Sequence, residues 1–128
     1  MQKKCINSPS APPAVGPYSH SVAAGNFLFV SGQCPFAPNG SGPVRGSVEE
    51  EARLALSNLR GILENAGSSL DRVVKTTVFL KDMNDFAAFN AVYAEFFPQN
   101  PPARTCIQAG ALPLGVQVEV EAIALLAD

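Results

Sequence analysis

Two segments of this chain are apolar on both sides of an extended backbone, and this feature limits the folds that the chain can adopt. From Val73 to Leu80 both sets of alternating positions are largely apolar, and Ala122 to Ala127 is apolar throughout. Alternate side chains of a strand point to opposite faces of its sheet. A sheet built from these strands therefore needs apolar cover on both faces.

The sequence predicts two helices that can cover one face of this sheet. From Ser47 to Ala66 apolar residues recur at helical spacing. Ser47 and Glu50 form a capping box, Glu49 to Glu51 suit the positive end of the helix dipole, and Gly67 suits the left-handed position after a helix. The polar positions of this helix are expected to face solvent: Glu49, Arg53, Asn58, Arg60 and Glu64. A second helix is predicted from about Asn84 to Phe97, with an aromatic stripe on one side and prolines after it.

The remaining segments predict strands and loops. The proline-rich first twenty residues exclude a helix and predict an extended arm or loop. Gly25-Asn26 predicts a hairpin turn between strands at 21–24 and 27–33. Residues 35–46 contain many prolines and glycines and predict an exposed loop. The last third predicts strands at 103–108 and 116–126 around a Leu-Pro-Leu-Gly turn.

Two helices can cover one face of such a sheet but not both. We therefore favour an α+β sandwich whose second sheet face packs against other copies of the chain in closed cyclic symmetry. The alternative is that a barrel or long loops within the chain cover that face. The length of 128 residues favours one domain spanning 1–128. The composition, 47% hydrophobic and only 16% charged, agrees with apolar surface being left for a partner.

Charge and cysteine content exclude several classes of function. The net charge of −2 and the scattered Lys and Arg residues disfavour nucleic acid as the main ligand. Three cysteines without a C-x-x-C pair, and one histidine, predict no metal site and fit reduced thiols in a cytoplasmic protein. The sequence shows no signal peptide and no apolar run long enough to span a membrane, so we expect neither export nor a membrane span.

Catalysis has to rest on ordinary acid, base and hydrogen-bonding side chains, because the motifs of phosphate loops, zinc proteases and serine hydrolases are lacking. Arg104 opens a predicted strand, and its guanidinium could bind a substrate carboxylate in a bidentate fork. The alternative for Arg104 is a surface or interface salt bridge. Cys106 lies two residues on and on the same face, as a wall of a site or as a small packed hydrophobe.

Other candidates are less distinct. Glu119 and Glu121 share one face of a strand, and partial burial of either could raise its pKa enough to deprotonate water. Pairing with a cation or exposure to solvent is the alternative, and the residues alone do not choose between the two glutamates. Tyr18 and Asn90 could each bind a ligand or satisfy local backbone. His20 has no carboxylate or nucleophile beside it in sequence, which disfavours a catalytic role.

A series of short motifs then matches one known family in order along nearly the whole chain. They include Gly-Pro-Tyr-Ser at 16–19, Phe-Val-Ser-Gly-Gln at 29–33, Val-Lys-Thr-Thr-Val-Phe at 74–79, Pro-Ala-Arg at 102–104 and Val-Glu-Val-Glu-Ala at 118–122. Each motif is weak alone, but the ordered set is specific. The chain resembles the RidA/YjgF family, also labelled L-PSP endoribonuclease or translation-inhibitor proteins.

The resemblance implies a chorismate-mutase-like α+β fold: a mixed six-stranded sheet with two helices on one face, in a homotrimer with a central β-barrel and active clefts at the subunit interfaces. It also implies a 2-iminobutanoate and 2-iminopropanoate deaminase. Such an enzyme hydrolyses reactive imino acids, which arise from pyridoxal-phosphate-dependent dehydratases, to 2-oxo acids and ammonia. The hydrolysis needs no cofactor.

The resemblance assigns roles to individual residues. Arg104 corresponds to the residue that holds the substrate carboxylate and Glu119 to the residue that positions water, whereas Glu121 does not match a site position. Five further residues are expected to line the cleft: Tyr18, Ser31, Gly32, Asn90 and Cys106. The chain departs from the family pattern at His20, at Gly110 and in a compact 35–46 loop. These departures touch the rim of the cleft and leave the preferred side chain of the substrate open.

Two other functions stay open at this point. The family label implies an endoribonuclease or translation inhibitor, although the chain lacks a pair of histidines, a basic stripe and an aromatic stacking motif. The same clefts could also belong to a non-catalytic trimer that binds small ligands or acts as a chaperone. The presence of both Arg104 and Glu119 favours catalysis.

Overall fold

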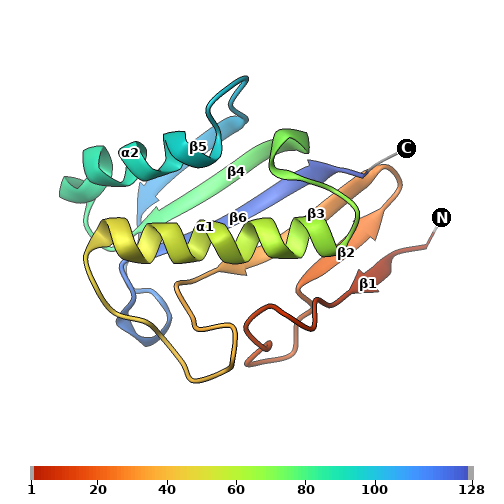
Figure 1. Ribbon diagram of the computed structural model, residues 1–128, viewed down its shortest axis with the longest axis horizontal. Coiled ribbons are helices and arrows are strands. Elements are labelled where there is room, and N and C mark those ends of the chain that lie inside the picture. The colour runs from red at the N-terminus through yellow and green to blue at the C-terminus, as the bar shows by residue number, and fades with distance from the viewer. Residues whose placement is uncertain (1, 127–128) are drawn as a thin grey trace.

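The structure, a computed structural model, describes residues 2–126 and contains a six-stranded mixed sheet with both helices packed on one face (Figure 1). The strands are β1 (Lys4–Ile6), β2 (Ser21–Ala24), β3 (Phe27–Gln33), β4 (Val73–Leu80), β5 (Ala103–Gln108) and β6 (Val118–Leu125). Their order across the sheet is β1-β2-β3-β6-β4-β5. Neighbours are antiparallel except β4 and β5, which are parallel and joined through the second helix. The predicted α+β architecture is confirmed.

The first helix, α1 (Val48–Asn65), has the ends that its sequence predicts. Ser47 and Glu50 form the reciprocal capping box, and Gly67 has a φ of 84°, in the left-handed region. The second helix, α2 (Phe86–Phe96), begins two residues later than expected. The Asp82 side chain accepts a hydrogen bond from Asn84 N, and Met83–Asp85 forms a turn of 3₁₀ helix instead.

Two polar residues of α1 are buried. Asn58 was expected to face solvent, and this prediction is wrong: it is buried, and its Nδ2 donates to the carbonyl oxygens of Cys34 (3.1 Å) and Phe36 (3.0 Å). Glu51 is also buried and accepts from Gln117 N (2.9 Å) and Nε2 (2.8 Å). Both residues bind the segments that enter or leave the sheet beside the helix, a requirement that helical periodicity does not reveal.

The register of β6 separates the two faces of the sheet. Val118, Val120, Ala122 and Ala124 are buried under the helices. The alternate positions of β6, which include Glu119 and Glu121, therefore point to the opposite face. On that face Glu119 lies beside Phe79 of β4, and Glu121 lies beside Thr77.

The face of the sheet opposite the helices, called here the open face, is uncovered and carries several exposed apolar side chains. Phe27, Phe29, Ile107 and Leu125 lie on it and are 37–46% exposed. Within residues 2–126 no loop or additional layer covers this face, so the alternative of cover within the chain is wrong. Ala127, the end of the apolar run noted in the sequence, lies outside the described residues.

The N-terminal arm contains one strand that the sequence did not predict. Lys4–Ile6 pairs antiparallel with β2, and the rest of the arm up to residue 20 is irregular, as expected. Among the described residues, no helix combines the length and the apolar character needed to cross a membrane.

Candidate functional site

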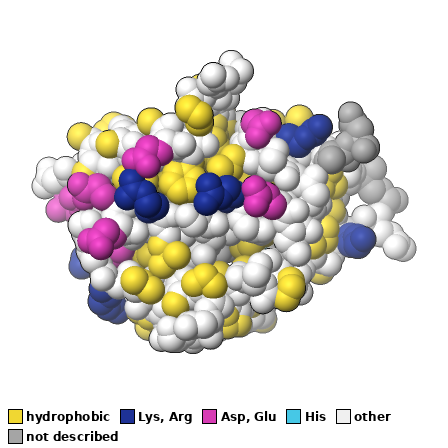
Figure 2. Space-filling model, in the orientation of Figure 1, with side chains coloured by type: hydrophobic (Ala, Val, Ile, Leu, Met, Phe, Trp, Pro, Cys, Tyr) yellow, Lys and Arg dark blue, Asp and Glu magenta, His cyan; other side chains and the backbone are white. Residues whose placement is uncertain are grey.

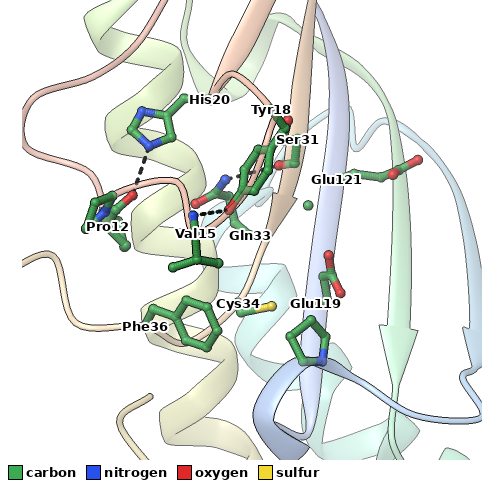
Figure 3. A pocket seen from close by; sticks show the side chains of 13 residues that line it. Pro12, Val15, Tyr18, His20, Ser31, Gln33, Cys34, Phe36, Glu119 and Glu121 are labelled. Carbon is green, nitrogen blue, oxygen red and sulfur yellow. Dashed lines mark hydrogen bonds between the residues drawn. The ribbon is translucent and has the colours of Figure 1, made fainter. Parts of the chain in front are cut away.

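A cavity of about 410 Å³ opens beside the ends of β3 and β6, next to the N-terminal loop (Figure 3). Four of the predicted site residues line it: Tyr18, Ser31, Gly32 and Glu119. Its volume is in the range of small-molecule sites. Other side chains around it are mainly apolar or carry a single polar group: Pro12, Pro13, Val15, His20, Gln33, Cys34, Phe36, Pro113 and Glu121. We call this the carboxylate cavity.

Glu119 is the half-buried acid of the carboxylate cavity. Its carboxylate lies against the backbone of Gly32, so closely that a Cβ added there would overlap Oε2 and lie 2.9 Å from Cδ. Burial raises the pKa of Glu119, a hydrogen bond from the Cys34 thiol lowers it, and the charge of Glu121 raises it. The net result is a pKa above the usual range of a glutamate, which suits a base that has to deprotonate water.

Cys34 lines the same cavity as Glu119. Burial, followed by the nearby negative charge of Glu119 and the hydrogen bond to it, raises the pKa of Cys34 to about 12. A thiol with this pKa is almost entirely protonated at neutral pH and is a poor nucleophile. The Cys34 thiol therefore keeps its proton beside the Glu119 carboxylate.

Tyr18 and Ser31 form the polar rim of the cavity. Tyr18 is 45% exposed, and its hydroxyl accepts a long hydrogen bond, 3.4 Å, from Val15 N. Ser31 Oγ donates to the carbonyl of Ser19 at 2.6 Å. The hydroxyl of Ser31 thus fixes the backbone of the 18–20 segment, whereas that of Tyr18 remains accessible to a ligand.

His20 supports the wall of the cavity. Its Nδ1 accepts from Ser8 N at 3.0 Å, and its Nε2 lies 2.9 Å from the carbonyl oxygen of Pro12, to which it donates. Both ring nitrogens are therefore bound to the N-terminal arm. This structural role agrees with the sequence argument against catalysis by His20.

The other predicted site residues form a second group, on α2 and β5. The guanidinium of Arg104 lies 4.8 Å from the ring centroid of Tyr93 and 5.5 Å from that of Phe86. Its Nη1 donates to Asn90 Oδ1 at 2.8 Å. In the part of the chain that the structure describes, Arg104 has no carboxylate partner, so the salt-bridge alternative finds no partner within the chain. We call Arg104, Asn90, Tyr93 and Cys106 the guanidinium shelf.

Tyr93 and Cys106 complete the guanidinium shelf. The Tyr93 hydroxyl hydrogen-bonds Thr76 Oγ1 at 2.7 Å in the core, which fixes the ring beneath Arg104. Cys106 is half-buried and packs against the core. Burial raises the pKa of the Cys106 thiol, while the charge of Arg104 lowers it. Cys106 is therefore a wall of the shelf and has no base to activate it.

The two groups lie on opposite faces of the same sheet. Arg104 is paired in register with Thr76, which is fully buried beneath the helices. Glu119 is paired with Phe79 and points to the open face. Because side chains on opposite faces of a sheet are separated by its backbone, one small substrate cannot contact both groups of one chain. A single chain thus carries two separate groups, called here the two candidate half-sites.

Sequence reasoning did not name Cys34 and Tyr93 as candidate site residues. Cys34 is separated from Glu119 by most of the chain, and nothing in the sequence connects them. Tyr93 was assigned to the aromatic core stripe, and it does pack between Phe89 and Phe97. A signal for its second role existed in principle, because Asn90 and Tyr93 lie three residues apart and share a helix face.

The described residues contain no cluster of His, Cys, Asp and Glu side chains with the geometry of a metal site. The helical face of the molecule mixes both signs of charge with apolar patches, and Lys and Arg do not gather into a stripe there (Figure 2).

Comparison with known proteins gives one consistent result. The family model described as Endoribonuclease L-PSP matches residues 8–126. The RutC family protein PH0854 of Pyrococcus horikoshii is 48% identical over 122 residues, covering 95% of this chain and 97% of that protein. TdcF of Escherichia coli, whose name designates it provisionally as a reactive intermediate deaminase, is 43% identical over 126 residues, covering 96% of this chain and 97% of that protein.

Solved structures agree. The crystal structure of E. coli TdcF with bound serine has a TM-score of 0.91 at 42% identity, covering 97% of this chain and 99% of that one. The crystal structure of the E. coli YjgF gene product has a TM-score of 0.88 at 45% identity, covering 95% and 98%. These matches extend over both half-sites and the whole sheet. The chain therefore belongs to the endoribonuclease L-PSP family, the RidA/YjgF family that its motifs resemble.

Proposed function

We propose that this protein hydrolyses 2-imino acids, including 2-iminobutanoate and 2-iminopropanoate, to 2-oxo acids and ammonia. The observation that carries the proposal is the pair of half-sites. One is a guanidinium that is fixed by Asn90 and two rings and that has no carboxylate partner among residues 2–126; the other is a half-buried carboxylate with a raised pKa in a small cavity. One half-site suits the carboxylate that all 2-imino acids share. The other suits activation of water.

The chemistry requires few groups. Arg104 binds the substrate carboxylate and holds the C=N carbon in place. Glu119 removes a proton from water as its oxygen bonds to that carbon, which forms a carbinolamine. That proton then passes from Glu119 to the nitrogen, which makes ammonia the leaving group. As the C–N bond breaks, the hydroxyl group gives its own proton to Glu119, and the 2-oxo acid and ammonia leave. The overall change is a hydrolysis without electron transfer, so the proposal includes no cofactor.

We further propose that the two half-sites meet between subunits of a homotrimer. Arg104 and Glu119 lie on opposite faces of one sheet, so a complete site needs Arg104 from one copy and Glu119 from another. The exposed apolar side chains of the open face support such an assembly, because packing the open faces around a three-fold axis removes them from water. A central β-barrel of three sheets is the arrangement that the family fold implies.

The ligand bound to one relative supports the proposed class of substrate, a small acid with a carboxylate. One solved structure of TdcF contains bound serine, a small amino acid with the carboxylate that Arg104 is proposed to bind. Imino acids of this size are products of pyridoxal-phosphate-dependent dehydratases, which we propose as the metabolic source. We propose the cytoplasm as the compartment on the basis of the three unpaired cysteines, although one yeast relative is named as mitochondrial.

Endoribonuclease activity is the alternative that the family description carries. The structure gives little support to ribonuclease activity, because both ring nitrogens of the one histidine, His20, are bound to the N-terminal arm. A non-catalytic ligand-binding or chaperone-like trimer is the second alternative. The experiment below distinguishes both alternatives from deamination.

The test measures 2-oxo acid and ammonia release from imines generated in situ by an amino acid oxidase or a threonine dehydratase. The wild type is expected to exceed spontaneous hydrolysis. Arg104→Ala should lose on the order of 100-fold in kcat/KM, because charged hydrogen bonds to the substrate are lost. Arg60→Ala is the matched control, since Arg60 also stacks on a ring, that of Phe96 at 5.3 Å, but belongs to neither the guanidinium shelf nor the carboxylate cavity. No rate above buffer in the wild type would refute the proposal.

A further inference from the structure

The Cys34 thiol lies next to the Glu119 carboxylate and is held there by the fold. Cys34 directly follows β3, is buried, and lines the carboxylate cavity with its sulfur directed toward Glu119 (Figure 3). Its carbonyl oxygen accepts from Asn58 Nδ2 at 3.1 Å. Because Asn58 belongs to α1 and also binds Phe36, the backbone on which the thiol stands is fixed to the helix.

The carboxylate is confined from the opposite direction as well. Glu119 lies against Gly32 at a distance that leaves no room for a Cβ. It therefore has backbone on one side and the Cys34 sulfur on another, and the number of rotamers open to it is small. A base that attacks through one fixed water needs this restriction.

Among the titratable side chains that line the described cavity, Cys34 is the one suited to donate to Glu119. The other titratable groups that line the cavity are Tyr18, His20 and Glu121. The His20 ring is bound to the N-terminal arm, Glu121 is of like charge, and the half-exposed Tyr18 is on the rim. From the neighbouring strand, β4, the residue in register with Glu119 is Phe79, which is apolar.

The protonation of the two groups fits a donor and an acceptor. Burial raises the pKa of Cys34 to about 12, so the thiol keeps its proton while Glu119 is ionised. In turn the hydrogen bond from Cys34 opposes the rise in the pKa of Glu119 that burial causes.

We propose that Cys34 is a positioning residue, whose S–H group donates a hydrogen bond that orients the ionised Glu119 carboxylate toward the substrate water. The thiol forms no covalent bond in the reaction. Its effect on catalysis rests on the function proposed above, whereas the hydrogen bond itself does not.

The test compares Cys34→Ala, which removes the donor, with Cys34→Ser, which keeps one, and with Cys5→Ala, which changes an exposed cysteine outside the cavity. The titration midpoint of the Glu119 carboxyl carbon is measured by ¹³C NMR and assigned with Glu119→Gln. The midpoint should move to higher pH in Cys34→Ala and stay close to the wild-type value in the other two variants. An unchanged midpoint in Cys34→Ala, or an equal rise in Cys34→Ser, would overturn the proposal.

Activity gives the second readout. The acid limb of the kcat profile should move with the NMR midpoint, and Cys34→Ala should lose roughly threefold in rate on that limb, since S–H is a weak donor. Cys34→Ser should restore the rate. If the wild type does not hydrolyse imines, the proposed function fails, but the NMR comparison still decides whether Cys34 donates to Glu119.

Discussion

Replacement of Gly32 by alanine tests whether Glu119 acts from the position that the structure gives it. Gly32 does not need a left-handed backbone, so alanine fits its conformation, and the conflict is only with the Glu119 side chain. The new Cβ would overlap Oε2 and lie 2.9 Å from Cδ, where ordinary contact begins at 3.4 Å. Cδ therefore has to move by about 0.5 Å and Oε2 by more.

A displacement of about 1 Å of a reacting group costs on the order of 100-fold in rate. We expect Gly32→Ala to lower kcat by about this factor in the imine hydrolysis assay, with the melting temperature nearly unchanged. Gly61→Ala is the matched control, because a Cβ at Gly61 meets nothing within 4 Å, and its activity should equal that of the wild type. A folded Gly32→Ala variant with wild-type kcat would refute the assigned position of Glu119.

Three further changes have defined outcomes. Glu121→Gln removes a negative charge that raises the pKa of Glu119, so the acid limb of the kcat profile, which requires ionised Glu119, should move to lower pH; a limb that stays or rises contradicts this. Asn90→Ala frees one nitrogen of Arg104 and should raise KM about tenfold with a smaller change in kcat, measured by steady-state kinetics. Asn58→Ala leaves two carbonyl groups without their donor and should lower the free energy of unfolding in urea by about 1–3 kcal/mol. An Asn58 variant as stable as the wild type would show that water replaces the amide.

The sequence predicted most elements of the fold because their signals are local. The capping box and the left-handed glycine define α1 within a few residues, and Gly25 with Asn26 places the β2–β3 hairpin. The strand at Lys4–Ile6 was missed because three residues carry no detectable period and the pairing partner lies about twenty residues away in sequence. The wrong orientation of Asn58 has a similar cause, since its partners belong to another segment of the chain.

The sequence predicted which candidate site residues share a strand face, but not how the two groups are arranged. Strand alternation places Arg104 with Cys106 and Glu119 with Glu121, and the structure agrees with both pairs. The relation between the pairs depends on strand order and register, which alternation does not specify. The separation of Arg104 and Glu119 by the sheet therefore came only from the structure, and it is the physical reason for proposing a site between subunits.

Subunit mixing tests the central claim, a deaminase site built from two chains, most directly. Arg104→Ala and Glu119→Gln are each expected to be inactive, because every site lacks one of the two groups. When equal amounts are dissociated and reassembled together, random trimers should regain about one quarter of the wild-type imine hydrolysis rate, since that fraction of interfaces joins an intact Arg104 to an intact Glu119. Mixed trimers that form but stay inactive would contradict the account.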